Sequence, residues 1–535
     1  MSDDVTRPDG GPPVGTPMRG RRKLWLAAGV AGLTGVVGLA ALGGLAARDD
    51  KSGDSERLSD AQASAPKQNV SDAGRADDDA RRADDEAGKA DDQAGGNPAA
   101  EGGNAWSGGD WSGDKDRGHD GRVTEVPCDT DKLIQAIVHA NRTDGATLKL
   151  ARHCTYELTR SEYGNGLPVI KESIVLKGEG TAIVRAAEAE RFRILNVGSG
   201  GHLALKDVTV KGGQTVAAKT VPAPVSSFGR AEVAKATAVT TAAPADADGA
   251  GILVQRGGRA DLEYSRIVRN HAGWNGGGIA NFGTTNLRHT TVEENSASGF
   301  GGGIFNVGVL RVEESKVSKN SARLGGGGIA NGTTPNGTTV GGGTVWVWKS
   351  TISHNRTSSI GGGVFDNRGD IVLTQSEITD NTAGTDAGGL VTFSDGRLSL
   401  EKVVVARNHA DGEAGGVGVG GGSNAVIEHS VIKENVAAGG GGGGLYNDEG
   451  NVTLRDSEVL GNQAVGEYGV GGGILNDFGR TKLISTKVVH NVATAPPGGI
   501  FTNNDGVLID RKSAVKDNRP TNCKGSTVIP DRCFA

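Results

Sequence analysis

Short apolar segments that end in asparagine recur along most of the chain. A Val or Ile stands three residues before each of ten such asparagines, and a Ser or Thr stands five residues before nine of them. Eight residues before the asparagine, nine of the ten positions are Leu, Ile or Val. Consecutive copies lie 25 to 35 residues apart, and the ten positions are Asn270, Asn295, Asn320, Asn355, Asn381, Asn408, Asn435, Asn462, Asn491 and Asn518.

Apolar positions at short steps, rich in β-branched residues and bounded by Gly and Asn, predict strands rather than helices. One turn of this length cannot bury its apolar side alone, but turns stacked ~4.8 Å apart share a continuous core. Asparagine tolerates the left-handed conformation, and stacked copies can pass amide hydrogen bonds along the stack. We therefore predict an all-β parallel β-helix over residues 123–535, with insertions near 213–249 and 332–343.

The start of this region is different and predicts an atypical first turn. Asp129 can cap a short amphipathic helix, and Ala146 to Leu158 reads as the first strand. Terminal units of repeat proteins must cover the core, so we expect this helix to do so. Its apolar face consists of Leu133, Ile134, Ile137 and Val138.

Two resemblances extend this interpretation. The run from Gly301 to Asn306, Gly-Gly-Gly-Ile-Phe-Asn, resembles the GGA-I and F-x-x-N repeats of chlamydial polymorphic membrane proteins, with Gly in place of the usual third-position Ala. The opening cysteine, helix, T-L-x-L and second cysteine, from Cys128 to Cys154, resembles pectin-lyase-like right-handed β-helix proteins of actinobacteria. The resemblance implies a right-handed helix on a fold that often hosts lyases, hydrolases and epimerases.

The N-terminal part predicts export. Residues 24–47 carry no charge and are long enough to cross a bilayer as a helix. Basic residues precede them and Asp49 and Asp50 follow, which predicts a cytoplasmic tail over 1–23 and an extracytoplasmic location for the rest. A permanent single-pass anchor and a cleaved signal both fit, because Arg21-Arg22 resembles a twin-arginine signal.

Composition predicts a spacer and a single folded domain. Residues 48–122 are mostly Asp, Ala, Gly, Ser and Lys, which predicts a disordered acidic linker. The 89 Gly and 4% aromatic residues of the chain do not suit a series of conventional globular cores. The net charge of −6 offers no basic field for nucleic acid, and we expect a monomer.

Four cysteines lie at the two ends of the predicted solenoid. They allow three pairings. Pairing of Cys128 with Cys154 and of Cys523 with Cys533 is favoured, because the two couples are separated by the whole array. An exported protein meets an oxidising compartment, where disulfides persist. Free buried thiols are the alternative.

Two tryptophans are the predicted ligand-binding residues. Trp346 and Trp348 flank the core position Val347 and should both be exposed, just after the insertion around 332–343. Adjacent outward indoles are suited to stacking on sugar rings. Burial of the two side chains beneath the insertion is the alternative interpretation.

Glu401 and Glu428 are the catalytic candidates. Both lie seven residues before a ladder asparagine, so they should stack on consecutive turns at a spacing like that of the carboxyls of retaining glycosidases. The alternative is that Arg455 and solvent neutralise two surface glutamates. The calcium-binding aspartates and arginine of pectate lyases cannot be placed on these repeats, and the histidines show no metal-ligand spacing.

The sequence thus favours an exported, non-enzymatic surface protein that presents a long face for adhesion or for binding a polysaccharide or other cell-envelope component, without cofactor or metal. A lyase, glycoside hydrolase or epimerase acting on uronic-acid polymers is the rival, supported only by analogy of fold. A purely structural envelope component is a third possibility.

Overall fold

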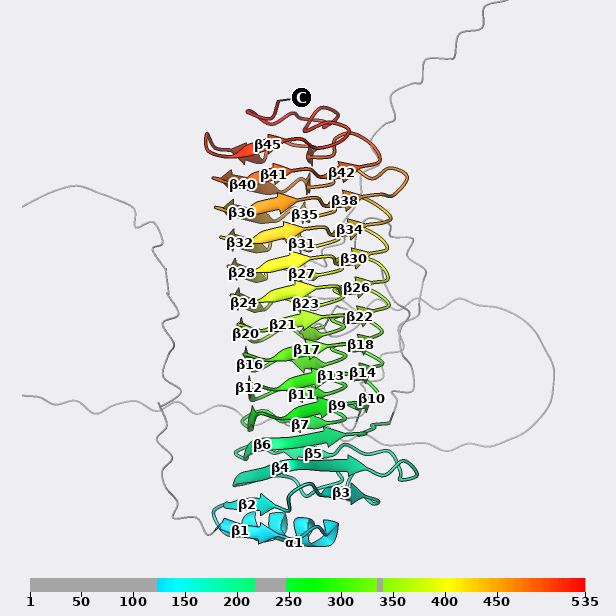
Figure 1. Cartoon of the computed structure of the whole chain (residues 1–535), viewed down its shortest axis with the longest axis vertical. Coiled ribbons are helices and arrows are strands. Elements are labelled where there is room, and N and C mark those ends of the chain that lie inside the picture. The colour runs from blue at the N-terminus through cyan, green and yellow to red at the C-terminus, as the bar shows by residue number, and fades with distance from the viewer. Residues whose placement is uncertain (1–122, 217–246, 334–339, 535) are drawn as a thin grey trace, which may run out of the picture. The chain divides into compact units, whose positions relative to one another are not determined.

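The computed structural model describes residues 123–216, 247–333 and 340–534. Parallel sheets of 25, 9 and 11 strands run along the stack, and each turn lies on the next (Figure 1). Helix α1 (Thr130–Ala140) is the one α-helix among these residues. The prediction of an all-β parallel solenoid is therefore confirmed.

A typical turn contributes two strands to the 25-strand sheet and one to each of the other sheets. Before the regular turns, the 25-strand sheet contains β1 (Val123–Val126), β2 (Ala146–Leu150), β3 (Thr155–Leu158), β4 (Ser173–Arg185) and β6 (His202–Lys211). Its regular first strands are β8 (Arg259–Glu263), β12 (Thr284–Arg288), β16 (Val309–Glu313), β20 (Thr344–Trp348), β24 (Asp370–Thr374), β28 (Arg397–Glu401), β32 (Asn424–Glu428), β36 (Asn451–Arg455), β40 (Arg480–Ile484) and β44 (Val507–Ile509). The second strands are β9 (Arg266–Val268), β13 (Thr291–Glu293), β17 (Lys316–Ser318), β21 (Thr351–Ser353), β25 (Glu377–Thr379), β29 (Val404–Ala406), β33 (Val431–Lys433), β37 (Glu458–Leu460), β41 (Lys487–Val489) and β45 (Ala514–Lys516).

The two smaller sheets complete each turn. The 9-strand sheet contains β10 (His271–Ala272), β14 (Ser296–Ala297), β18 (Ser321–Ala322), β22 (Arg356–Thr357), β26 (Thr382–Ala383), β30 (His409–Ala410), β34 (Val436–Ala437), β38 (Gln463–Ala464) and β42 (Val492–Ala493). The 11-strand sheet contains β5 (Leu195–Val197), β7 (Ile252–Val254), β11 (Ile279–Asn281), β15 (Ile304–Asn306), β19 (Ile329–Asn331), β23 (Val364–Asn367), β27 (Leu390–Phe393), β31 (Val417–Gly420), β35 (Leu445–Asp448), β39 (Ile474–Asp477) and β43 (Ile500–Thr502).

The core consists of rows of Val, Ile and Leu that run from turn to turn. Val459 illustrates one row: it lies in register with Ile432 on one side and Val488 on the other, and all three are at most 1% exposed. Burying such a side chain contributes roughly 1.5–3 kcal/mol. The position three residues before each ladder asparagine is buried in all ten turns, as the periodicity predicts.

The asparagine row links the turns by hydrogen bonds. The Asn381 amide donates to Oδ1 of Asn408 (3.0 Å) and to the backbone oxygen of Ile352 (3.0 Å), while its Oδ1 accepts from the backbone N–H of Asn355 (2.9 Å). The left-handed residue, however, is the one before the asparagine, such as Asp380 with φ 58°. Asparagine tolerates the left-handed conformation, but here the residue before it adopts that conformation and the asparagine itself is buried.

The ends of the solenoid agree with several expectations. Helix α1 begins after Asp129, whose side chain accepts from the backbone N–H of Lys132 (3.1 Å), and Leu133 and Ile137 are fully buried. Disulfides join Cys128 to Cys154 and Cys523 to Cys533, so both predicted pairings are confirmed.

Several predicted segments lie outside the described residues. These are the basic tail (1–23), the anchor or signal segment (24–47), the acidic linker (48–122) and most of the insertion near 213–249. Among the residues that the structure describes, no helix has the length and apolarity needed to span a bilayer.

A second apolar layer covers the outward face of the 11-strand sheet. Phe305, Phe365 and Tyr446 are each at most 2% exposed and pack outside the main core, together with Phe300 and Ile360 from the loops between sheets. This layer was not predicted from the sequence. These large side chains occur in only some turns, so they form no regular period.

Candidate functional site

Trp346 and Trp348 lie on the outward face of β20. Strand residues alternate in direction, so the buried Val345 and Val347 place both indoles on the opposite face from the core. Both side chains point outward, as expected, and both are partly buried. The guanidinium of Arg311 lies 4.6 Å from the ring centroid of Trp346, and the Lys349 ammonium lies 4.1 Å from that of Trp348. Each contact is a cation–π interaction that covers part of one ring.

Trp346 continues a row of polar side chains on neighbouring strands. Asp261, Asn286, Arg311 and Trp346 are in register on β8, β12, β16 and β20, and we call them the polar–aromatic row. The amide of Asn286 donates to Oδ1 of Asp261 (2.6 Å). Arg311 Nη1 in turn donates to Oδ1 of Asn286 (3.4 Å). The row therefore links a carboxylate, an amide, a guanidinium and an indole side by side.

Asp261 is the charged end of this row. Burial opposes its ionisation, but hydrogen bonds from His202 (2.7 Å) and Asn286, with the charge of Arg259, lower the pKa of its carboxyl below the ordinary value. The aspartate is therefore ionised at neutral pH and acts only as an acceptor. It orients Asn286, which in turn orients Arg311 beneath Trp346.

Of this row, only Trp346 was predicted from the sequence, whereas the charged candidates Glu401 and Glu428 belong to the column seven residues before the ladder asparagine. The polar–aromatic row lies nine residues before it, and a step of two along a strand returns to the same face. Counting back two further residues would have found Asp261, Asn286 and Arg311. Amides, guanidinium groups and indoles together can bind hydroxyls, anionic groups and ring faces of a sugar.

The structure also brings Glu401 and Glu428 together. They are directly opposite each other on β28 and β32, and both are partly exposed. Each has a cation beside it: Lys402 Nζ lies 3.0 Å from Glu401, and Arg455 forms an ion pair with Glu428. The structure therefore contains both the carboxylate pair on which the catalytic interpretation depends and the arginine that neutralises Glu428 in the alternative interpretation.

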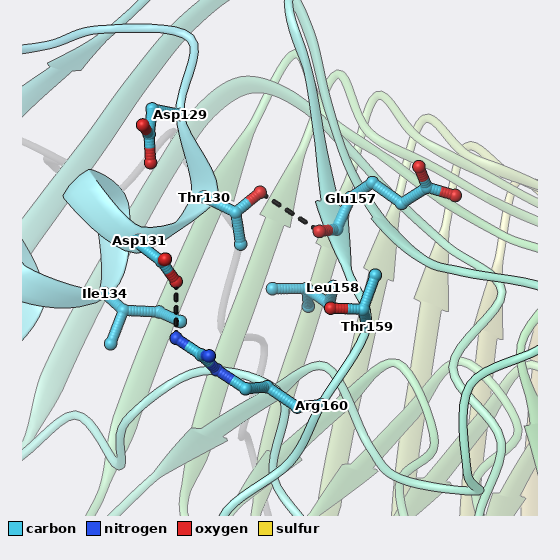
Figure 2. Close-up of a pocket in the computed structure, with 8 residues that line it drawn as sticks. All are labelled: Asp129, Thr130, Asp131, Ile134, Glu157, Leu158, Thr159 and Arg160. Carbon is cyan, nitrogen blue, oxygen red and sulfur yellow. Dashed lines mark hydrogen bonds and ion pairs between the residues drawn. The ribbon is translucent and has the colours of Figure 1, made fainter.

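Two hollows lie at the ends of the described solenoid, and neither is lined by the tryptophans. A cavity of about 200 Å³ beside α1 is lined by acidic Asp129, Asp131 and Glu157, and Arg160 lies 2.6 Å from Asp131 (Figure 2). A larger one of about 380 Å³ lies between β44 and residues 528–532. Within the described part of the chain, no group of three or more His, Cys, Asp or Glu side chains could hold a metal ion.

Comparison with known proteins agrees with the fold. A family model for the right-handed β-helix region matches residues 336–493, and the solenoid is accordingly right-handed. No curated protein matches the chain.

Several solved structures are similar at low identity. The mannuronan C-5 epimerase AlgE6 A-module of Azotobacter vinelandii is 14% identical, with 75% of this chain and 94% of that chain covered and a TM-score of 0.28. Tailspike protein 3 of bacteriophage CBA120 is 13% identical, with 74% and 59% covered and a TM-score of 0.31. The pectate lyase Pel9A is 14% identical, with 72% and 74% covered and a TM-score of 0.29.

Proposed function

We propose that this protein is an exported surface protein whose 25-strand sheet binds a polysaccharide along its outward face. The observation that carries the proposal is the pair of outward indoles on β20, joined to the polar–aromatic row. Trp346 is held by Arg311, which is itself held through Asn286 and Asp261. A site whose side chains are already positioned loses little conformational entropy when a ligand binds.

The Lys349 side chain determines how a sugar could approach Trp348. Its ammonium covers one ring, but about half of the side chain is exposed, and its ion pair with Glu314 is long at 4.0 Å. A flexible surface lysine can move aside at little cost. Arg311 is more firmly held, so it stays in place and offers its guanidinium to the ligand.

Export and presentation complete the proposal. The two disulfides support folding in an oxidising compartment. In this proposal residues 24–47 direct the chain to the membrane, as an anchor or a cleaved signal, and residues 48–122 hold the solenoid away from it. The solenoid acts as a monomer in adhesion or in contact with the cell envelope.

Retention of the full chain on a panel of neutral and uronic-acid polysaccharides, by affinity electrophoresis, tests the proposal. We expect retention on at least one polymer, and we expect Trp346→Ala and Trp348→Ala each to weaken binding several-fold, since an aromatic contact contributes about 1 kcal/mol. Thr453→Ala, at an equivalent outward position on β36, is the matched control. Arg311→Gln should weaken binding of an acidic polymer more than of a neutral one. Equal retention of all variants would contradict the proposal.

The second candidate function is catalysis on uronic-acid polymers, favoured by the register of Glu401 with Glu428. Adjacent parallel strands lie ~4.8 Å apart, close to the ~5 Å carboxyl separation of retaining glycosidases. Reducing-sugar and unsaturated-product assays on the same panel test this directly. Product formation that Glu401→Gln or Glu428→Gln abolishes would establish it, and the absence of product on every bound polymer would leave binding as the function.

A further inference from the structure

The N-terminal end of the same face places a serine, a histidine and an aspartate in one line. Ser173 on β4 is in register with His202 on β6, and Asp261 lies on the next strand, β8. The Ser173 hydroxyl is 3.4 Å from Nδ1 of His202, and Nε2 of His202 is 2.7 Å from Oδ2 of Asp261. The imidazole therefore has a hydroxyl at one nitrogen and a carboxylate at the other.

The carboxylate fixes the tautomer of His202. Asp261 is ionised, so it can only accept a hydrogen bond, and Nε2 of a neutral His202 must carry the proton. Nδ1 is then unprotonated and faces the Ser173 hydroxyl as an acceptor. A histidine so placed can take a proton from a serine while a carboxylate orients the ring, as in a catalytic triad but with the roles of the two ring nitrogens exchanged.

Asp261 is itself firmly held. Its oxygens accept from Nε of Arg259 (2.9 Å), from the Asn286 amide (2.6 Å) and from His202, and its side chain is only 20% exposed. The three donors come from three consecutive strands. Asp261 is therefore a positioning residue for the His202 ring.

Ser173, in contrast, is open to solvent. Its residue is exposed, and the register of β2 with β4 places Gly145 opposite it on the side away from His202. Gly145 packs against the backbone of Ser173 on that side, since a Cβ added to Gly145 would collide with the Ser173 carbonyl oxygen. A substrate therefore reaches the exposed Ser173 hydroxyl from solvent.

Hydrogen-bonded rows are common in a stacked solenoid, so the other histidines provide a comparison. His271 contacts the Ser296 hydroxyl (2.7 Å) without a carboxylate at its other nitrogen, and His409 contacts Asp411 (3.0 Å) without a hydroxyl. Among the histidines that the structure describes, His202 alone joins a hydroxyl to a carboxylate.

We propose that Ser173, His202 and Asp261 form a serine-nucleophile site that hydrolyses small acyl esters. Ser173 Oγ attacks the ester carbonyl carbon and its proton passes to Nδ1 of His202. The carbonyl re-forms, the bond to the alcohol oxygen breaks, and His202 gives that oxygen the proton. Water then attacks the acyl-serine with its proton taken by His202, and the acid leaves as Ser173 recovers the proton.

The site does not depend on polysaccharide binding, so it can be tested with a small probe. The full chain is treated with a fluorophosphonate, which phosphonylates activated serines, and the adduct is located by peptide mapping. We expect one dominant adduct, on Ser173, that is absent from Ser173→Ala. Loss of the base in His202→Gln should slow labelling at least 100-fold, within the range for general-base catalysis, whereas His409→Gln should label like the wild type.

The rate of p-nitrophenyl acetate hydrolysis should change in the same way: lost in Ser173→Ala, strongly reduced in His202→Gln and unchanged in His409→Gln. Thermal melts check that each variant is folded. For Asp261, Asp261→Asn should slow labelling while Asp261→Glu recovers part of the rate, because a carboxylate is restored. Labelling of Ser173 no faster than that of other surface serines would overturn the proposal. So would an unchanged labelling rate in a folded His202→Gln.

Discussion

Asp366 interrupts a row of buried amides in the 11-strand sheet. Asn306 donates to Asn331 (2.8 Å), and Asn331 donates to Oδ1 of Asp366 (2.8 Å), while Thr392 donates to Oδ2 (2.7 Å). Asp366 is 0% exposed. Burial raises the pKa of its carboxyl to about 7, although hydrogen bonds from Thr392 and Asn331 oppose the shift.

The consequence for stability follows from the two protonation states. The ordinary value is 3.8, so between about pH 4 and pH 7 the folded state keeps a proton that the unfolded chain has released. The contribution of Asp366 to the free energy of unfolding is therefore fully present below about pH 4 and is lost as the pH rises to about 7. About three pH units at 1.36 kcal/mol each give a loss of about 4 kcal/mol.

Asp366→Asn removes this loss. The amide has the shape of the protonated carboxyl, and its Nδ2 can donate to the Thr392 oxygen. We expect no change in stability below pH 4 and a gain of about 4 kcal/mol at pH 8. For roughly 400 residues at ~2 cal/mol/K per residue, that gain raises Tm by about 5 °C. Thermal melts of both proteins from pH 4 to pH 8 measure the difference.

Asp380→Asn is the control, because Asp380 is partly exposed, is paired with Arg407 (2.9 Å) and is not among the charges that raise the pKa of Asp366. Its loss should cost no more than about 1 kcal/mol. A difference between Asp366→Asn and wild type that stays constant from pH 4 to pH 8 would refute the assignment of a raised pKa. So would an Asp366→Asn protein less stable than wild type at pH 8.

Two further predictions concern the solenoid. Val459→Asp should lower the free energy of unfolding by several kcal/mol, because an unpaired carboxylate would lie among fully buried aliphatic side chains. Arg455→Asp, at an outward position, should lower it by about 1 kcal/mol or less. Equal losses of stability in thermal melts would contradict the assignment of Val459 inward and Arg455 outward. Peptide mapping without reduction should find one bridge within the first pair of cysteines and one within the last pair, and a bridge between the two pairs would contradict the structure.

Regular features could be predicted from the sequence because they repeat. The row that contains Val459 has a Val or Ile in every turn, so one count fixed both its direction and its burial. The strand over 344–348 followed from the same register, which placed Trp346 and Trp348 outward. Periodicity predicts whether a side chain points inward or outward, but it does not predict which side chains contact it on the same face.

The remaining features depend on irregular neighbours. Arg311 and Lys349 reduce the exposure of the indoles, and neither contact follows from spacing alone. Ser173 and His202 precede the insertion near 213–249, and Asp261 follows it. Their alignment could not be predicted, because the insertion breaks the regular number of residues per turn. The left-handed position could not be assigned from the tolerance of asparagine for this conformation, because the residue before each ladder asparagine adopts it.

Hydroxyl-radical footprinting of the tryptophans is the most direct measurement of the proposed binding face. The full chain is oxidised with and without the polysaccharide that retains it best, and side-chain oxidation is read by mass spectrometry. Trp274 is partly buried in the separate layer outside the 11-strand sheet and serves as the internal reference. We expect protection of Trp346 and Trp348 with Trp274 unchanged. Bound polysaccharide that leaves Trp346 and Trp348 as reactive as in the free protein would show that the ligand lies elsewhere.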